Sequence, residues 1–106
     1  MADIETLPTT RRATRTERPK LWKVILLNDD YTPREFVVSV LKCVFRMSED
    51  EATLVMLAAH RQGACVVAVF TKEVAETKTA QANEAGLSKG YPLTFTTERE
   101  DVGTTD

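Results

Sequence analysis

The sequence predicts an α+β domain, a small three-stranded antiparallel sheet with three helices packed on it. Residues 20–28 and 64–71 are short β-branched and aliphatic runs, which are typical of strands. Three longer segments each begin at a helix-capping residue, and helical spacing of apolar residues is clear in the first of them. The resulting order is strand, helix, helix, strand, helix, strand. This is the order of an α+β domain whose helices cover one face of the sheet.

The first strand, "KLWKVILLN", ends at the turn-forming residues "NDD". The segment "TPREFVVSVLKCVFRM", residues 32–47, then has an apolar face at helical spacing. Thr32 is a suitable N-cap, Pro33 suits the first helical position, and Glu35 completes a capping box. We therefore expect the first helix to begin at Thr32, with the acidic residues before it helping to cap its free N–H groups.

The second helix is expected over residues 48–63, "SEDEATLVMLAAHRQG". Ser48 is the predicted cap, Glu51 closes a capping box, and Gly63 ends the helix. The run "ACVVAVFT" that follows is almost continuously apolar or β-branched, which indicates a well-buried strand.

The last two elements are a helix and a half-exposed strand. Thr71 can cap the helix "KEVAETKTAQANEA", which we expect to stop at Gly86. Residues 86–92 are expected to form a loop. The segment "LTFTT" alternates apolar and hydroxyl side chains, as a strand with one face in water does.

Length, charge and composition limit the class of protein. The chain has 106 residues, enough for one small domain, and a net charge of −2, which argues against nucleic-acid binding over the whole chain. No apolar run approaches the ~20 residues of a membrane span, and no signal-peptide pattern is present. Cys43 and Cys65 lie in apolar runs, so we expect buried free thiols in a cytoplasmic protein. A single histidine and the lack of a C-x-x-C motif mean that zinc-site spacing is absent.

Residues 1–19, "MADIETLPTTRRATRTERP", differ in composition from the rest of the chain. They contain prolines, threonines and arginines with almost no aliphatic periodicity, so they cannot bury enough apolar surface to offset the entropy of ordering. We expect a flexible N-terminal extension at 1–19 and one folded domain at 20–106. The extension is either a solvated terminus or a mildly basic binding arm.

Asp29, Asp30 and His60 are the only obvious acid–base set, and two carboxylates with a histidine could serve catalysis or hold a metal. Adjacent carboxylates on an extended chain point in opposite directions, however, and the sequence has no recognisable nucleophile elbow or glycine-rich phosphate loop. An enzyme is therefore the weaker hypothesis. A purely structural alternative is that "DDYTP" only caps a helix and that His60 is a surface residue near a helix C-terminus.

A binding site joins these residues more completely. Asn28 and Asp29 end the first strand, and His60 lies near the end of the second helix. If the first two helices pack side by side, Val37 and Met56 can line a hollow whose rim carries these three acceptors. An apolar floor beneath a negative, acceptor-rich rim suits the free N-terminus of a peptide whose first residue is large and hydrophobic.

The blocks "NDDYTP" and "EVAETK", with "MLAAHRQG" between them, resemble the ClpS family from about residue 20 to residue 98. Proteins of that family are adaptors that deliver N-end-rule substrates to the unfoldase-protease ClpAP; they are not enzymes and use no cofactor. The resemblance implies hydrogen bonds from the substrate α-ammonium to Asn28, Asp29 and His60. It also implies a side-chain pocket and a face that docks on the N-terminal domain of the ClpA unfoldase. The pocket positions are Thr32, Arg34, Val37, Met56, Ala59 and Leu93, and the docking positions are Glu73, Glu76 and Lys78.

The resemblance also implies peptide and unfoldase partners, with no nucleic acid or membrane, and we expect a monomer. Two positions depart from the family pattern. Arg34 stands where methionine is usual at the pocket mouth, and Ala59 stands where valine is usual. Arg34 either alters discrimination among first residues or is a solvated helix residue without effect. Because the ClpS fold resembles the C-terminal domain of the ribosomal stalk protein, a docking domain without a peptide pocket is the alternative function.

Overall fold

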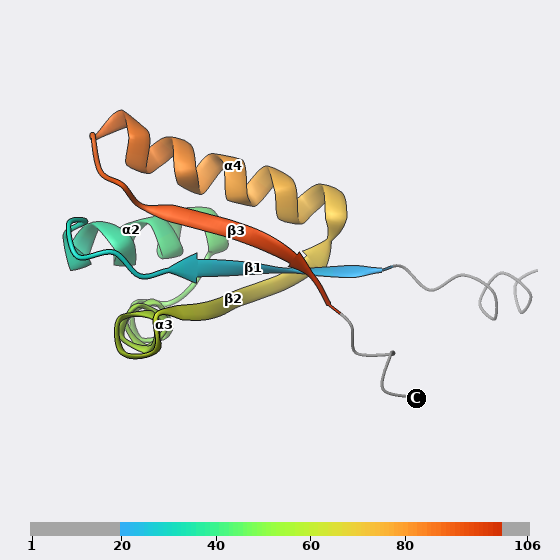
Figure 1. The fold of residues 1–106 in the computed structure, drawn as a ribbon, viewed down its shortest axis with the longest axis horizontal. Helices are drawn as coiled ribbons and strands as arrows, with labels where there is room; N and C mark the ends of the chain where they lie inside the picture. Colours follow the sequence, from blue (N-terminus) through green and yellow to red (C-terminus); the bar gives the residue numbers. More distant parts are fainter. Residues whose placement is uncertain (1–19, 101–106) are drawn as a thin grey trace, which may run out of the picture.

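The computed structural model describes residues 20–100, and the predicted extension at 1–19 lies outside them. The elements follow the predicted order, and the predicted α+β class is confirmed (Figure 1). Their bounds are β1 Leu21–Leu27, α2 Arg34–Phe45, α3 Glu49–Gln62, β2 Ala64–Thr71, α4 Lys72–Ser88 and β3 Thr94–Arg99.

The three strands form one antiparallel sheet with the order β2-β1-β3. Val24 and Leu26 of β1 and Phe95 of β3 are buried on its inner face. On the outer face the Lys23 ammonium lies 3.8 Å from the Glu98 carboxylate. Side chains alternate between the two faces of a strand, so this pattern gives one face to the core and leaves the other partly in water.

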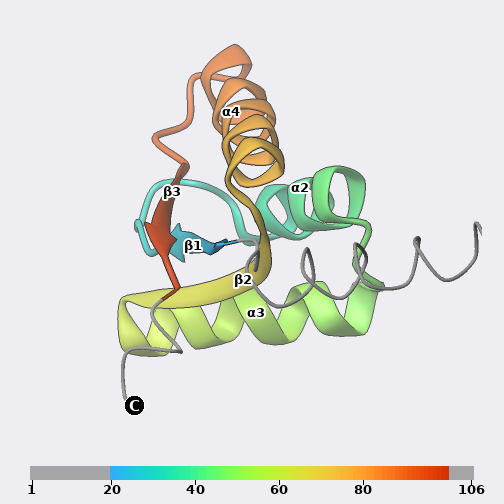
Figure 2. The same ribbon diagram turned by 90° about the vertical axis from the view of Figure 1, so that its right-hand side faces the viewer.

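The helices lie on the inner side of the sheet and along one of its edges. Figure 2 shows α4 above, α2 beside the sheet, and α3 below, next to β2. Helix α4 packs on β3, α3 packs on β2, and α2 contacts both of the other helices. The buried apolar residues form one cluster, made up of Val24, Leu26, Val37, Val40, Leu41, Ala52, Met56, Ala59, Val67, Ala75, Ala82, Leu93 and Phe95.

The predicted capping box of the first helix is wrong. Helix α2 begins at Arg34 with Pro33 in the N-cap position, and no side chain caps it. The Thr32 hydroxyl instead donates a hydrogen bond of 2.9 Å to Asp29 Oδ2. In a cap the hydroxyl would accept a bond from a neutral backbone N–H, whereas here it donates to an ionised carboxylate. The bond to the carboxylate is the stronger of the two, so the hydroxyl turns back towards Asp29.

Helix α3 begins and ends as its sequence predicts. The Ser48 hydroxyl accepts from the Glu51 N–H, the Glu51 carboxylate accepts from the Ser48 N–H, and both bonds are 3.1 Å long. Gly63 then takes a left-handed conformation with φ of 91°, and its N–H bonds to the Ala59 carbonyl. This φ suits glycine because it has no Cβ to clash with the backbone.

Helix α4 does not stop at Gly86 as expected but runs on to Ser88. Gly86 is required for packing, because a Cβ placed there would lie 2.9 Å from Leu93 Cβ. Asn83, on the same helix, bonds both polar groups of the Phe95 backbone, at 2.7 and 3.1 Å. Together these contacts fix the start of β3 against α4.

The expectation that both cysteines are buried holds only in part. Both are free thiols, but Cys43 is exposed and Cys65 is half-buried. Cys43 is not on the buried face of α2, which carries Val37, Val40 and Leu41. The 3.6-residue repeat of the helix points its side chain towards solvent instead. Burial raises the pKa of the Cys65 thiol. Among the described residues, no helix combines the length and apolar character that crossing a membrane would require.

Candidate functional site

A cavity of about 290 Å³ lies where β1 ends, between the first residues of α2 and the last turn of α3. All nine positions predicted for substrate binding line it: Asn28, Asp29, Thr32, Arg34, Val37, Met56, Ala59, His60 and Leu93. Five further residues complete the lining: Leu26, Leu27, Asp30, Tyr31 and Pro33. The structure therefore brings three separate segments of the chain, residues 26–37, 56–60 and 93, to one hollow.

One backbone contact joins the end of β1 to the end of α3. The Asn28 N–H donates to the Gly63 carbonyl at 3.0 Å, and the Gly63 N–H donates to the Ala59 carbonyl at 2.8 Å. Gly63 can close the helix only because it tolerates a positive φ. This closure places Asn28 and His60 on the same rim.

Asp29 is held in a fixed orientation by the turn that follows it. Its Oδ1 accepts the backbone N–H groups of Tyr31 and Thr32 at 2.8 and 2.7 Å, and its Oδ2 accepts the Thr32 hydroxyl at 2.9 Å. A carboxylate offers about four acceptor positions, two on each oxygen. Three of them are used here, so Oδ2 keeps one for a ligand.

The floor of the cavity is apolar and well packed. Val37, Ala59 and Leu93 are buried, with 7%, 2% and 5% of their surface exposed. Met56 is also buried, and the side chain of Thr32 closes the floor towards Asp29. Leu93 can reach the cavity because Gly86 lets it approach α4 closely.

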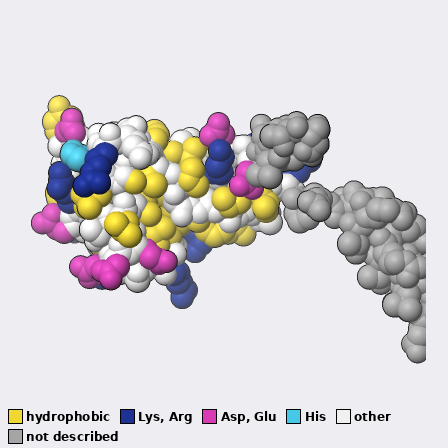
Figure 3. Space-filling view, turned by 90° about the horizontal axis from the view of Figure 1, so that it is seen from below, with side chains coloured by type: hydrophobic (Ala, Val, Ile, Leu, Met, Phe, Trp, Pro, Cys, Tyr) yellow, Lys and Arg dark blue, Asp and Glu magenta, His cyan; other side chains and the backbone are white. Residues whose placement is uncertain are grey.

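Of the nine predicted positions, Asn28, Arg34 and His60 are the exposed ones. Arg34 Nη2 lies 3.3 Å from His60 Nε2, across 26 residues of sequence. A guanidinium only donates hydrogen bonds, so this nitrogen of the imidazole is the acceptor and bears no proton. In Figure 3 the only histidine side chain, in cyan, borders basic side chains in dark blue. Arg34 is therefore hydrogen-bonded to His60 rather than to water alone.

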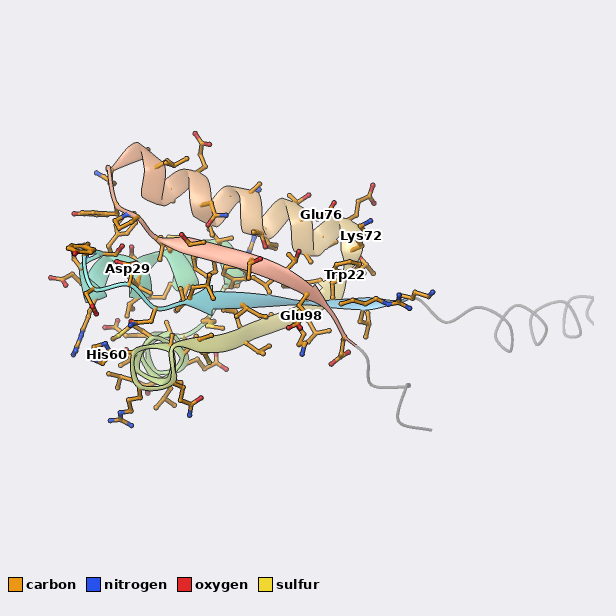
Figure 4. All side chains as sticks on the ribbon, viewed as in Figure 1. Trp22, Asp29, His60, Lys72, Glu76 and Glu98 are labelled. Carbon is orange, nitrogen blue, oxygen red and sulfur yellow. The ribbon has the colours of Figure 1, made fainter. Side chains whose placement is uncertain are left out.

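The three positions predicted for unfoldase docking lie away from the cavity. In Figure 4, Glu76 on α4 is at the end of the molecule opposite Asp29 and His60. Glu73 and Glu76 are exposed, but Lys78 is half-buried. Its ammonium donates to the Val44 carbonyl at 2.8 Å, near the end of α2, and so stabilises that helix terminus.

Tyr31 is a lining residue that sequence reasoning missed. Its side chain is 81% exposed, yet it lies at the cavity mouth between Asp29 and Thr32. The signal available was its place inside the "NDDYTP" turn. Within the described part of the chain, no group of three or more His, Cys, Asp and Glu side chains could hold a metal ion.

Comparison with known proteins finds one family repeatedly. The family model described as "ATP-dependent Clp protease adaptor protein ClpS" matches residues 17–96. The chain is 63% identical over 101 residues to the ClpS 2 adapter protein of Mesorhizobium japonicum, covering 95% of this chain and all of the relative. It is 64% identical, with the same coverage, to the ClpS 1 adapter protein of Bradyrhizobium diazoefficiens.

A solved structure also matches closely. The chain resembles Agrobacterium tumefaciens ClpS2 bound to L-phenylalaninamide, with a TM-score of 0.77 and 61% sequence identity. The match covers 78% of this chain and all of that one.

Proposed function

This chain belongs to the ClpS family of Clp protease adaptors, and from that premise we propose that it binds the free N-terminus of proteins that begin with Leu, Phe, Tyr or Trp. Members of the family are adaptor proteins and not enzymes. In the proposed function, the bound substrate is delivered to the ClpA unfoldase of the ClpAP protease in the cytoplasm. The adaptor acts as a monomer and needs no cofactor.

The strongest support is the orientation of Asp29 above an apolar floor. An α-ammonium has three N–H donors and needs about three acceptors around it. The free position on Asp29 Oδ2, the Asn28 amide oxygen and a neutral His60 nitrogen supply them. Each charge-assisted bond contributes about 1.5–3 kcal/mol, and burial of a Leu or Phe side chain adds about 1.5–3 kcal/mol.

The size of the cavity suits one side chain. A volume of about 290 Å³ accommodates a benzyl or isobutyl group but not a folded segment. The Agrobacterium protein was solved with L-phenylalaninamide, a compound that combines a free amine with a benzyl side chain. A docking domain without a peptide pocket would have no use for a carboxylate held above buried apolar residues, so the adaptor function is favoured over that alternative.

Arg34 and Ala59 bear on the choice of first residue. A guanidinium at the pocket mouth can stack on an aromatic ring, and alanine at position 59 enlarges the floor relative to valine. We therefore expect aromatic first residues to be preferred over leucine.

Delivery needs a second surface, and the exposed face of α4 supplies a candidate. Glu73 and Glu76 are exposed in its first two turns, and Figure 4 shows Glu76 at the end of the molecule opposite Asp29 and His60. A partner docked there leaves the pocket mouth accessible. Lys78 lies on the same helix, but its ammonium donates a hydrogen bond to the end of α2. We therefore assign it a supporting role at this face rather than a direct contact with the partner.

The test compares Asp29→Asn with Asp50→Asn. Asparagine at position 29 still accepts the two backbone N–H groups of the turn but removes the negative charge from the ammonium site. Affinity for a Phe-initiated peptide, measured by fluorescence anisotropy, should fall about 10- to 100-fold. Asp50 is an exposed carboxylate that does not line the cavity, and its variant should bind like the wild type. Equal losses in the two variants would show that only net charge matters and would reject the assigned site.

A further inference from the structure

We propose that Arg34 is an internal competitor of the substrate, because in the free protein it occupies the one hydrogen-bond acceptor of His60. Arg34 is the first residue of α2 and His60 lies in the last turn of α3, so their contact spans the cavity mouth. The distance from Arg34 Nη2 to His60 Nε2 is 3.3 Å. The inference rests on the proposed function, in which His60 accepts a bond from the substrate α-ammonium.

The competition follows from the chemistry of a neutral imidazole, which has one protonated nitrogen and one acceptor nitrogen. Arg34 donates to Nε2, so the proton is on Nδ1. An ammonium that approaches Nε2 must displace the guanidinium directly. An ammonium that approaches Nδ1 finds a donor there, and the proton must first move to Nε2, which again breaks the contact with Arg34. Either route requires Arg34 to release His60.

The hydrogen bond between Arg34 and His60 competes with the α-ammonium of the substrate and not with the side chain of its first residue. It therefore weakens binding of every free N-terminus by a similar factor, and only ligands that gain enough from the apolar floor are retained. Arg34 sets a threshold for binding, which is distinct from any stacking on an aromatic ring. Because the pair is solvent-exposed and one partner is neutral, the factor is modest, about 2- to 10-fold.

The first experiment observes His60 directly, without a substrate. His60 is the only histidine in the chain, so its ring ¹⁵N signals need no assignment among several residues. At about pH 8.5, where imidazole is neutral, the wild type should show the Nδ1–H tautomer. Arg34→Met, which keeps an apolar stem but loses the donor, should shift the ring towards the Nε2–H form that predominates in free imidazole. A wild-type ring already in the Nε2–H form would overturn the proposal.

The second experiment measures binding of a Leu-initiated peptide, because its first side chain has no ring on which Arg34 could stack. Arg34→Met should bind about 2- to 10-fold more tightly than wild type. The same substitution in a His60→Ala background should give no gain, because the acceptor is gone. Arg61→Met is the matched control, since Arg61 is an exposed neighbour of His60 for which no hydrogen bond or ion pair is found within residues 20–100.

The outcomes separate the two proposals. A gain in Arg34→Met that Arg61→Met reproduces, or that persists without His60, would assign the effect to charge and overturn the competition. Binding that does not depend on Asp29 would overturn the proposed function itself, whereas the tautomer of His60 would still report on its contact with Arg34.

Discussion

The two ends of this small domain are built in different ways. The pocket end gathers side chains from β1, α2, α3 and the residue before β3, and fixes them by backbone contacts such as that from Asn28 to Gly63. The proposed docking face is a run of neighbouring residues on one helix, α4. The pocket therefore depends on the whole fold, whereas the docking face depends mainly on exposed charge. Perturbations of the two ends should separate accordingly.

The largest expected effect is on docking. Reversing both charges in the double variant Glu73→Lys, Glu76→Lys should reduce affinity for the ClpA N-terminal domain about 100-fold or more, because two carboxylates proposed to bind basic groups of the partner would become cations. Peptide affinity should not change, since both residues are exposed and neither lines the cavity. Surface plasmon resonance with immobilised ClpA domain, together with anisotropy for the peptide, measures the two separately. Parallel losses in both assays would contradict the independence of the two ends.

Gly86→Ala should instead affect the pocket from a distance. The added methyl group would lie 2.9 Å from Leu93 Cβ, so helix and floor must move apart. We expect a loss of about 1–3 kcal/mol in the free energy of unfolding, the usual cost of overpacking, and weaker peptide binding with it. Thermal unfolding followed by circular dichroism gives the first quantity. Gly90→Ala is a useful comparison, because its added methyl meets no atom within 4 Å and any cost comes from its φ of 76° alone. Unchanged peptide affinity in a destabilised Gly86→Ala would show that Leu93 does not shape the floor.

A smaller effect should follow the loss of the His60 acceptor, and only at the pocket. His60→Ala removes one of the three acceptors proposed for the α-ammonium, so affinity for a Phe-initiated peptide should fall about 10-fold. His60→Gln keeps a side-chain oxygen that can accept a hydrogen bond, so it should lose less. Fluorescence anisotropy measures both affinities. Equal losses in the two variants would show that hydrogen-bond acceptance at position 60 does not contribute to binding.

The local sequence predicted the helices and strands well where neighbouring residues alone determine the structure. The capping box of α3 and its glycine end are as expected, because cap residues act within a few positions. Strand β2 forms where its β-branched run predicts it. The expectation that this strand is well buried is wrong, because only Val67 is buried and the outer face of the sheet leaves Val66 and Val69 exposed. The prediction that Val37 and Met56 share a hollow also held, since the helical spacing of both helices put these residues on facing sides.

Other features needed the three-dimensional structure. The Thr32 hydroxyl can cap a helix or bond Asp29, and the sequence does not distinguish the two. Gly86 looked like a helix end, but the close approach of Leu93 is its actual constraint. The contact between Arg34 and His60 joins residues 26 positions apart, so no local pattern contains it. Lys78 is predicted on a docking surface, but its ammonium donates a hydrogen bond to the Val44 carbonyl at the end of α2.

The central claim is that the rim binds a free α-ammonium while the floor binds one apolar side chain. Acetylation of the N-terminus of a Phe-initiated peptide tests it most directly, because it removes the charge and two of the three N–H donors while leaving the benzyl group unchanged. Isothermal titration should detect binding of the free peptide and none of the acetylated one, since Asp29 would otherwise be left desolvated and unpaired. Comparable affinities for the two peptides would contradict the account.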